Sequence, residues 1–167
     1  MESEILKIFQ KIVTEACNKN IKIVTAESCT GGLISAYITS VSGSSEVFER
    51  GFVTYSNKAK AEILEVNKTS LNQFGAVSNQ VAKEMAEGCL KNSDSDIAVS
   101  VTGIAGPSGG SDEKPVGLVY IGLNNNGKIK IEKNIFSGDR QEVRLKSVKR
   151  AAEMILKEVE LYEYQNK

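Results

Sequence analysis

The chain contains no histidine and no tryptophan, and only three of its 167 residues are cysteines. The missing histidine excludes a Ser-His-Asp triad, a Cys-His dyad and any zinc site with histidine ligands. Cys17, Cys29 and Cys89 are widely spaced and form no Cys-x-x-Cys pair, so they are expected to be reduced thiols rather than zinc ligands. Proton transfer in an enzyme of this composition has to use Lys, Tyr, Asp, Glu or Cys.

An excess of charge is also missing, because 21 Lys and Arg residues balance 21 Asp and Glu residues. A net charge of zero gives no electrostatic footprint for nucleic acid. No apolar run approaches the roughly 20 residues that cross a bilayer. The first four residues are acidic and lack the features of a signal peptide. We therefore expect a cytoplasmic protein that binds neither nucleic acid nor membranes.

Apolar spacing predicts helices that alternate with strands along the chain. Helical stripes run over residues 3–18, 33–41, 81–90 and 143–159, and a further helix follows the cap residue Ser56. Runs of strand-forming residues cover 21–25, 52–55, 96–101, 117–123 and 129–136, with a hairpin signal at 124–127. No linker divides the chain, so we expect residues 1–167 to form a single three-layer α/β/α domain with a mixed sheet. The polar tail after Tyr162 is expected to fray.

Two glycine-rich loops, residues 25–32 and 101–110, each follow an apolar strand. A strand that runs into a glycine loop and then a helix exposes backbone N–H groups to an anion. Hydroxyl side chains in both loops suggest a polar ligand of phosphate size, although neither loop fits a standard nucleotide fingerprint. Their hydroxyls could instead bond the backbone or cap a turn. The candidate ligand contacts are Ser28, Thr30, Gly31, Gly32, Thr102, Gly103 and Gly106.

A Ser-Lys pair is the second candidate for chemistry. Ser45 is expected in the first turn of a short helix, where free N–H groups favour an alkoxide or oxyanion. Lys60 could act as its base, because the N-terminal end of its own helix and the nearby cation Arg140 both disfavour an ammonium. Tyr55, at the end of the preceding strand, could relay the proton. Spacing alone favours the structural alternative, in which the serines cap a helix and Lys60 is solvated.

Three further side chains are considered as parts of a site. Cys29 lies at a predicted helix N-terminus but has no visible base partner, so a packing or ligand-lining role is expected. Arg140 opens the last helix and could pair with a phosphate or carboxylate. Glu27 could be a solvated loop charge or an acceptor for a sugar hydroxyl.

These motifs resemble those of the CinA C-terminal domain family. The segments that carry the resemblance are residues 25–32, 43–45, 48–57, 75–78, 102–110, 114–117 and 136–140. They match in order and spacing from about residue 5 to 160. The chain is most similar to the stand-alone form of the family, which acts as a nicotinamide-nucleotide amidase.

The resemblance implies hydrolysis of the carboxamide of nicotinamide mononucleotide to nicotinate mononucleotide and ammonia, as part of NAD salvage. It implies Ser45 as the nucleophile, Lys60 as the base and Tyr55 as an assisting group, with Thr102 and Arg140 at other polar positions of the site. It also implies that no metal or other cofactor is needed, and that the protein forms a homo-oligomer, commonly a dimer. The alternatives are a non-catalytic nucleotide-binding or regulatory module and an amidase for another small amide.

Overall fold

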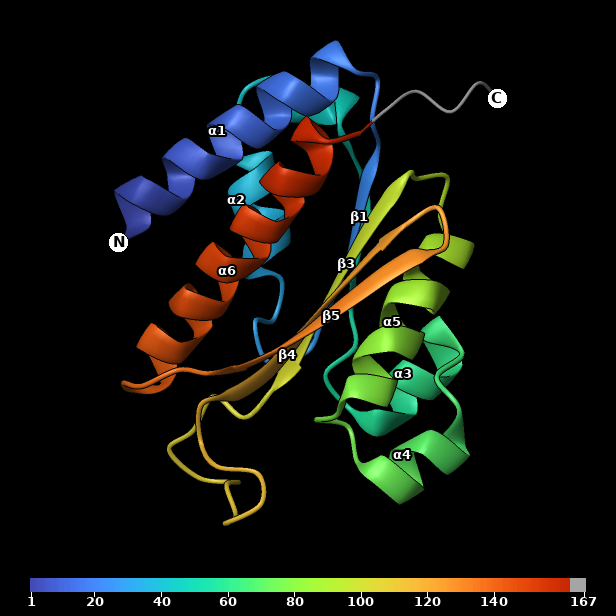
Figure 1. The fold of residues 1–167 in the computed structure, drawn as a ribbon, viewed down its shortest axis with the longest axis vertical. Coiled ribbons are helices and arrows are strands. Elements are labelled where there is room, and N and C mark those ends of the chain that lie inside the picture. The colour runs from blue at the N-terminus through green and yellow to red at the C-terminus, as the bar shows by residue number, and fades with distance from the viewer. Residues whose placement is uncertain (163–167) are drawn as a thin grey trace.

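A five-stranded sheet forms the centre of the computed structural model, which describes residues 1–162 (Figure 1). The strands are β1 (Ile23–Glu27), β2 (Phe48–Val53), β3 (Ile97–Gly103), β4 (Leu118–Asn125) and β5 (Lys128–Ile135). Their order in the sheet is β2-β1-β3-β4-β5. β1 is parallel to β2 and β3, whereas β4 is antiparallel to β3 and β5, so the predicted mixed sheet is confirmed.

Helices cover both faces of the sheet, which confirms the three-layer α/β/α arrangement (Figure 1). One face carries α1 (Glu2–Asn18), α2 (Leu33–Thr39) and α6 (Arg140–Glu160). The other carries α3 (Asn57–Leu64), α4 (Lys68–Phe74) and α5 (Asn79–Lys91). A 3₁₀ turn, η1 (Ser44–Glu46), precedes β2. Each face therefore has its own hydrophobic core, with Phe9 and Ile155 fully buried in one and Leu64 and Met85 in the other.

Local side-chain chemistry fixes where several elements begin. The hydroxyls of Ser56 and Ser78 accept hydrogen bonds from backbone N–H groups in the first turns of α3 and α5. Asp139 forms a reciprocal capping box with Glu142 at the start of α6. These caps place the first turns of α3 and α6 next to the same edge of the sheet.

Two features differ from the sequence-based prediction. β2 begins at Phe48, four residues before the strand predicted at 52–55, and it ends at Val53, before the predicted end of that strand. The helix α4 was not predicted, because it is only seven residues long and buries just Ser70 and Leu71. Within residues 1–162, the structure contains no helix with the length and apolar character needed to cross a membrane. The tail beyond Tyr162, expected to fray, lies outside the described residues.

The parallel register brings three chain segments together at the carboxyl edge of the sheet. Glu27, the last residue of β1, lies opposite Val53 of β2 and Val101 of β3. Backbone hydrogen bonds continue this register one residue further, from the Ser28 N–H to the Val101 carbonyl and from the Thr54 N–H to the Glu27 carbonyl. Ligand sites in open α/β sheets form at this edge.

Gly88→Ala is expected to lower the free energy of unfolding by about 1–3 kcal/mol, although alanine favours helices. A Cβ at position 88 of α5 would lie 1.8 Å from the Leu64 carbonyl oxygen at the end of α3. Urea unfolding measures the change. Glu87→Ala, an exposed change in the same helix, is the control and should shift stability by no more than about 0.5 kcal/mol. Equal stability of the two variants would contradict the close approach of α3 and α5.

Candidate functional site

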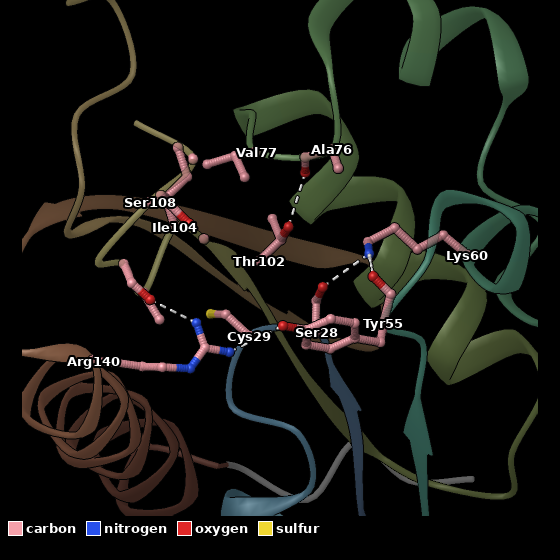
Figure 2. Close-up of a pocket in the computed structure, with 14 residues that line it drawn as sticks. Ser28, Cys29, Tyr55, Lys60, Ala76, Val77, Thr102, Ile104, Ser108 and Arg140 are labelled. Carbon is pink, nitrogen blue, oxygen red and sulfur yellow. Dashed lines mark hydrogen bonds between the residues drawn. The ribbon is translucent and has the colours of Figure 1, made fainter. Parts of the chain in front are cut away.

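A cleft of about 350 Å³ opens at the carboxyl edge of the sheet, between the start of α6 and the α3 and α5 side (Figure 2). This volume is near the lower end of the range for ligand pockets, which is about 300–1,000 Å³. Its lining consists of Ser28, Cys29, Tyr55, Lys60, Ala76, Val77, Thr102, Gly103, Ile104, Ala105, Gly106, Ser108, Gly109 and Arg140. The structure thus brings together seven predicted site residues from both glycine loops, the β2–α3 connection, α3 and α6. These are Ser28, Tyr55, Lys60, Thr102, Gly103, Gly106 and Arg140.

Lys60 and Ser28 form the polar centre of this cleft. The Lys60 Nζ donates a hydrogen bond of 2.9 Å to the Ser28 Oγ (Figure 2). It also donates to the backbone carbonyls of Thr54, at 2.8 Å, and Tyr55, at 3.3 Å. An ammonium uses all three of its N–H groups in this arrangement. A neutral amine keeps two N–H groups for the carbonyls and turns its lone pair toward the serine hydroxyl.

Burial changes the acidity of this lysine. Lys60 is 1% exposed, and no carboxylate of the described residues forms an ion pair with it. Loss of hydration disfavours the ammonium and lowers the pKa of Lys60 to about 8. The sequence-based hypothesis explained a neutral Lys60 by the helix terminus and Arg140. In the structure, burial is the cause of the lowered pKa. Roughly a tenth of such an amine is neutral at pH 7, against roughly one part in 3,000 at its ordinary pKa of 10.5.

Arg140 crosses the mouth of the cleft from the first residue of α6. Its Nη1 donates to the Gly106 carbonyl at 2.8 Å, and its Nη2 donates to the Tyr55 hydroxyl at 3.0 Å (Figure 2). Tyr55 is 62% exposed and contacts Lys60 through its backbone carbonyl rather than its hydroxyl. The geometry therefore connects the Tyr55 hydroxyl to Arg140 and not, as the sequence suggested, to the Ser-Lys pair.

The second glycine loop lines the cleft with unpaired backbone donors. Within the described part of the chain, the N–H groups of Ala105, Gly106, Ser108 and Gly109 have no hydrogen-bond partner. Thr102, at the end of β3, is 1% exposed, and its hydroxyl donates to the Ala76 carbonyl, which ties the loop before α5 to the sheet. The described lining residues include two cationic side chains and no Asp or Glu. This environment favours a ligand with a negative charge.

Ser45 lies at the opposite edge of the sheet, so its predicted pairing with Lys60 is wrong. It belongs to η1, just before β2, where the Lys22 Nζ donates to the Glu46 carbonyl and the Ile23 N–H donates to the Val47 carbonyl. The six residues of β2 separate this turn from the cleft by roughly 20 Å. The prediction failed because β2 begins at Phe48. Ser28, assigned only a ligand-donor role from the sequence, occupies the position beside Lys60.

The Glu27 side chain binds backbone N–H groups at the end of the first glycine loop. It is therefore neither solvated nor directed at a ligand. Its fully buried carboxylate accepts hydrogen bonds from the N–H groups of Gly32, Ile34 and Ser35 and from the Ser35 hydroxyl, at 2.8–3.1 Å. These donors form the first turn of α2, where the helix dipole favours a negative charge. Gly32 is therefore engaged in holding α2, and it does not line the cleft.

Three further residues, Arg144, Cys29 and Thr30, lie in or next to the turn that follows Ser28. Arg144 is not predicted from the sequence, and its guanidinium donates to the carbonyls of Cys29 and Thr30 in the first glycine loop. Cys29 lines the cleft as expected, and burial raises the pKa of its thiol to about 11. Thr30, like Gly31, is not among the lining residues. In residues 1–162, no group of three His, Cys, Asp or Glu side chains is arranged to hold a metal ion.

Comparisons with known proteins agree on one family. A family model described as the CinA C-terminal domain matches residues 6–159. A protein from Thermoanaerobacter pseudethanolicus, named as competence-damage inducible, is 48% identical over 155 residues, which are 93% of this chain and 36% of that protein. A similarly named protein from Clostridium novyi is 51% identical over 142 residues, covering 85% of this chain and 34% of its own length. The chain thus spans about a third of the length of these curated relatives.

Solved structures show the same fold. The competence/damage inducible protein CihA from Agrobacterium tumefaciens superposes with a TM-score of 0.90 at 46% identity, covering 92% of this chain and 94% of that one. The competence damage-inducible protein A from Klebsiella pneumoniae superposes with a TM-score of 0.92 at 30% identity, covering 95% and 99% of the two chains.

Glu27→Gln is expected to lower the free energy of unfolding by about 3 kcal/mol, because an amide group turns an N–H toward backbone donors that now reach a carboxylate oxygen. Chemical denaturation followed by circular dichroism measures this loss. Glu62→Gln is the matched control, since Glu62 is exposed and forms a surface ion pair with Lys58 in α3. A stability change as small in Glu27→Gln as in the control would show that the carboxylate does not hold α2.

Proposed function

The chain belongs to the CinA C-terminal domain family, and we propose that it hydrolyses the carboxamide of nicotinamide mononucleotide to nicotinate mononucleotide and ammonia. The observation that carries this proposal is the buried hydrogen bond of 2.9 Å between Lys60 and Ser28 inside a cleft that favours anions. A serine beside a desolvated lysine is a known arrangement for acyl transfer without histidine. The resemblance of the chain to the amidase form of the family supports the substrate.

Ser28 is the nucleophile in this mechanism. Neutral Lys60 accepts the Ser28 proton while the serine oxygen forms a bond to the amide carbon, and the carbonyl electron pair moves onto oxygen. The two backbone carbonyls that bind Lys60 hold its lone pair toward the serine. Loop N–H groups near Ser28 stabilise the negative oxygen. Stabilisation of this kind is usually the largest single electrostatic contribution to acyl transfer.

Release of ammonia uses the same lysine. The Lys60 ammonium returns a proton to the amide nitrogen as the carbon–nitrogen bond breaks, which leaves an ester between the nicotinoyl group and Ser28. Water then attacks this ester with Lys60 again accepting a proton, and the serine is regenerated. Each proton taken by Lys60 is given back, so the cycle needs no external acid or base beyond water.

The phosphate of the substrate is proposed to bind at the second glycine loop. The four residues with unpaired N–H groups, Ala105, Gly106, Ser108 and Gly109, line the cleft together with Arg140, whose guanidinium donates to the Gly106 carbonyl. Binding energy from a remote phosphate can position the reacting amide. Tyr55, held by Arg140, then covers the bound nucleotide. The family resemblance also supports a cytoplasmic location and a homo-oligomer, with a dimer as the expected form.

Ser28→Ala is expected to reduce ammonia release from nicotinamide mononucleotide by at least roughly 10³-fold, because it removes the nucleophile. Ser45→Ala is the matched control and should keep wild-type turnover, since Ser45 lies at the other edge of the sheet. A coupled ammonia assay on the purified proteins measures both. Nicotinamide riboside, which lacks the phosphate, should be a much poorer substrate.

Loss of turnover in Ser45→Ala but not in Ser28→Ala would reverse the assignment of the nucleophile. Nucleotide binding by the wild-type protein without any ammonia release would refute the amidase proposal and favour a binding module. Equal rates with nicotinamide riboside would place the substrate outside the phosphorylated nucleotides.

The pH dependence of kcat/KM should follow the deprotonation of Lys60. Since the base is active only as a neutral amine and its pKa is lowered to about 8, the rate should rise about tenfold per pH unit below that value and level off above it. Initial rates between pH 6 and 10 give the profile, and Lys60→Ala should lose the activity. A flat profile from pH 6 to 9 would contradict Lys60 as the base.

A further inference from the structure

Arg144, one turn after Arg140 in α6, holds the turn that follows Ser28. Its Nε donates to the Cys29 carbonyl at 3.2 Å, and its Nη2 donates to the Thr30 carbonyl at 3.0 Å. A guanidinium fork can fix two neighbouring carbonyls at once, which an ammonium cannot do with the same geometry. Arg144 does not itself line the cleft. Apart from its Nη1, which donates to the Gln141 side chain at 3.3 Å, its hydrogen bonds are with the backbone of the turn.

The direction of a backbone carbonyl also fixes the direction of the N–H group in the same peptide. The C=O and N–H groups of one trans peptide point to opposite sides. Because Arg144 holds the Cys29 carbonyl on the α6 side, the N–H of Thr30 in the same peptide points away from α6. The Ser28 carbonyl accepts from the Gly31 N–H, which turns the Cys29 N–H away from the inside of this turn.

Unused donors are concentrated in this turn. Among the described residues, the N–H groups of Cys29 and Thr30 have no hydrogen-bond partner from another residue. The Thr30 hydroxyl is also without a partner there, although the residue is fully buried. Cys29 lines the cleft whereas Thr30 is fully buried, so the Cys29 N–H is the donor of this turn that a ligand in the cleft can reach.

We propose that Arg144 is a positioning residue, which holds the turn of residues 28–31 so that the N–H group of Cys29, a residue that lines the cleft, receives the oxygen of the reacting carboxamide. The inference rests on the proposed amidase function and adds the donor of the oxyanion site and the residue that holds its turn in place. The N–H group that follows the nucleophile serves in this way in other hydrolases. Arg144 acts through the backbone and contacts no reacting atom.

The test compares Arg144→Ala, Arg144→Lys and the wild type in steady-state hydrolysis of nicotinamide mononucleotide. Arg144→Ala should lower kcat by roughly 10- to 100-fold with KM changed by less than about threefold, because ground-state contacts remain while oxyanion stabilisation weakens. Arg144→Lys should recover only part of the loss. Millimolar guanidinium added to Arg144→Ala should also restore part of kcat.

Arg150→Ala is the matched control. Arg150 lies on the same helix and is tied to Glu132 and Glu153, away from the cleft, so its loss should leave kcat unchanged. An equal fall of kcat in Arg150→Ala would assign the effect to general loss of stability and overturn the proposal. A fall in kcat/KM caused by KM alone would also overturn it.

Alkylation of Cys29 by iodoacetamide, measured by peptide mass spectrometry, tests the clamp without turnover. Releasing the turn in Arg144→Ala should speed alkylation of the buried Cys29, whereas Cys89, buried in the other core, stays protected and exposed Cys17 reacts in every variant. Absence of ammonia release by the wild type would refute the proposed function and, with it, the assignment of an oxyanion site. The labelling rate would then decide the clamp alone, a faster rate supporting it and an unchanged rate overturning it.

Discussion

The parallel alignment of β1 with β2 and β3 is the constraint on which the cleft depends. Because Glu27 lies opposite both Val53 and Val101, β1 and β2 end at one level, while β3 continues beside β4 to Gly103. Ser28 and Thr54 directly follow β1 and β2, and Thr102 is the residue of β3 that follows Val101. The same alignment places every segment that enters these strands, η1 included, at the far edge. A shift of one strand by two residues would separate the serine from the carbonyls that bind Lys60.

A buried cation without a carboxylate partner is costly, and here the protein keeps one at the centre of the cleft. Lys60 is surrounded by a hydroxyl and two backbone carbonyls, which satisfy its donors but do not neutralise its charge. The nearby thiol of Cys29 is also neutral at physiological pH, since burial raises its pKa. The site is therefore built to make an uncharged amine accessible near neutral pH, and stability is supplied by the two cores on either side.

Sequence patterns predicted the features that are local in the chain. Helical stripes, strand runs and the hairpin signal at 124–127 predicted the α/β class, and residues of both glycine loops line the cleft at the carboxyl edge of the sheet. The position of Ser45 could not be obtained in this way, because it depends on where β2 begins and on strand register, which involve residues far apart in sequence. The roles of Glu27 and Arg144 could not be predicted for a related reason. Their partners are backbone groups, and a sequence does not show which carbonyl or N–H faces a side chain.

Ser28 and Lys60 belong to different layers of the fold. Ser28 extends directly from the central strand β1, whereas Lys60 belongs to α3, a helix of eight residues whose end rests on α5 at Gly88. Local opening of α3 would admit water to Lys60, return its pKa toward the ordinary range and protonate it, while the sheet and the larger core stay folded. On the proposed mechanism, opening of α3 alone would stop turnover while the rest of the fold persists, so activity would be lost at a lower temperature than the fold.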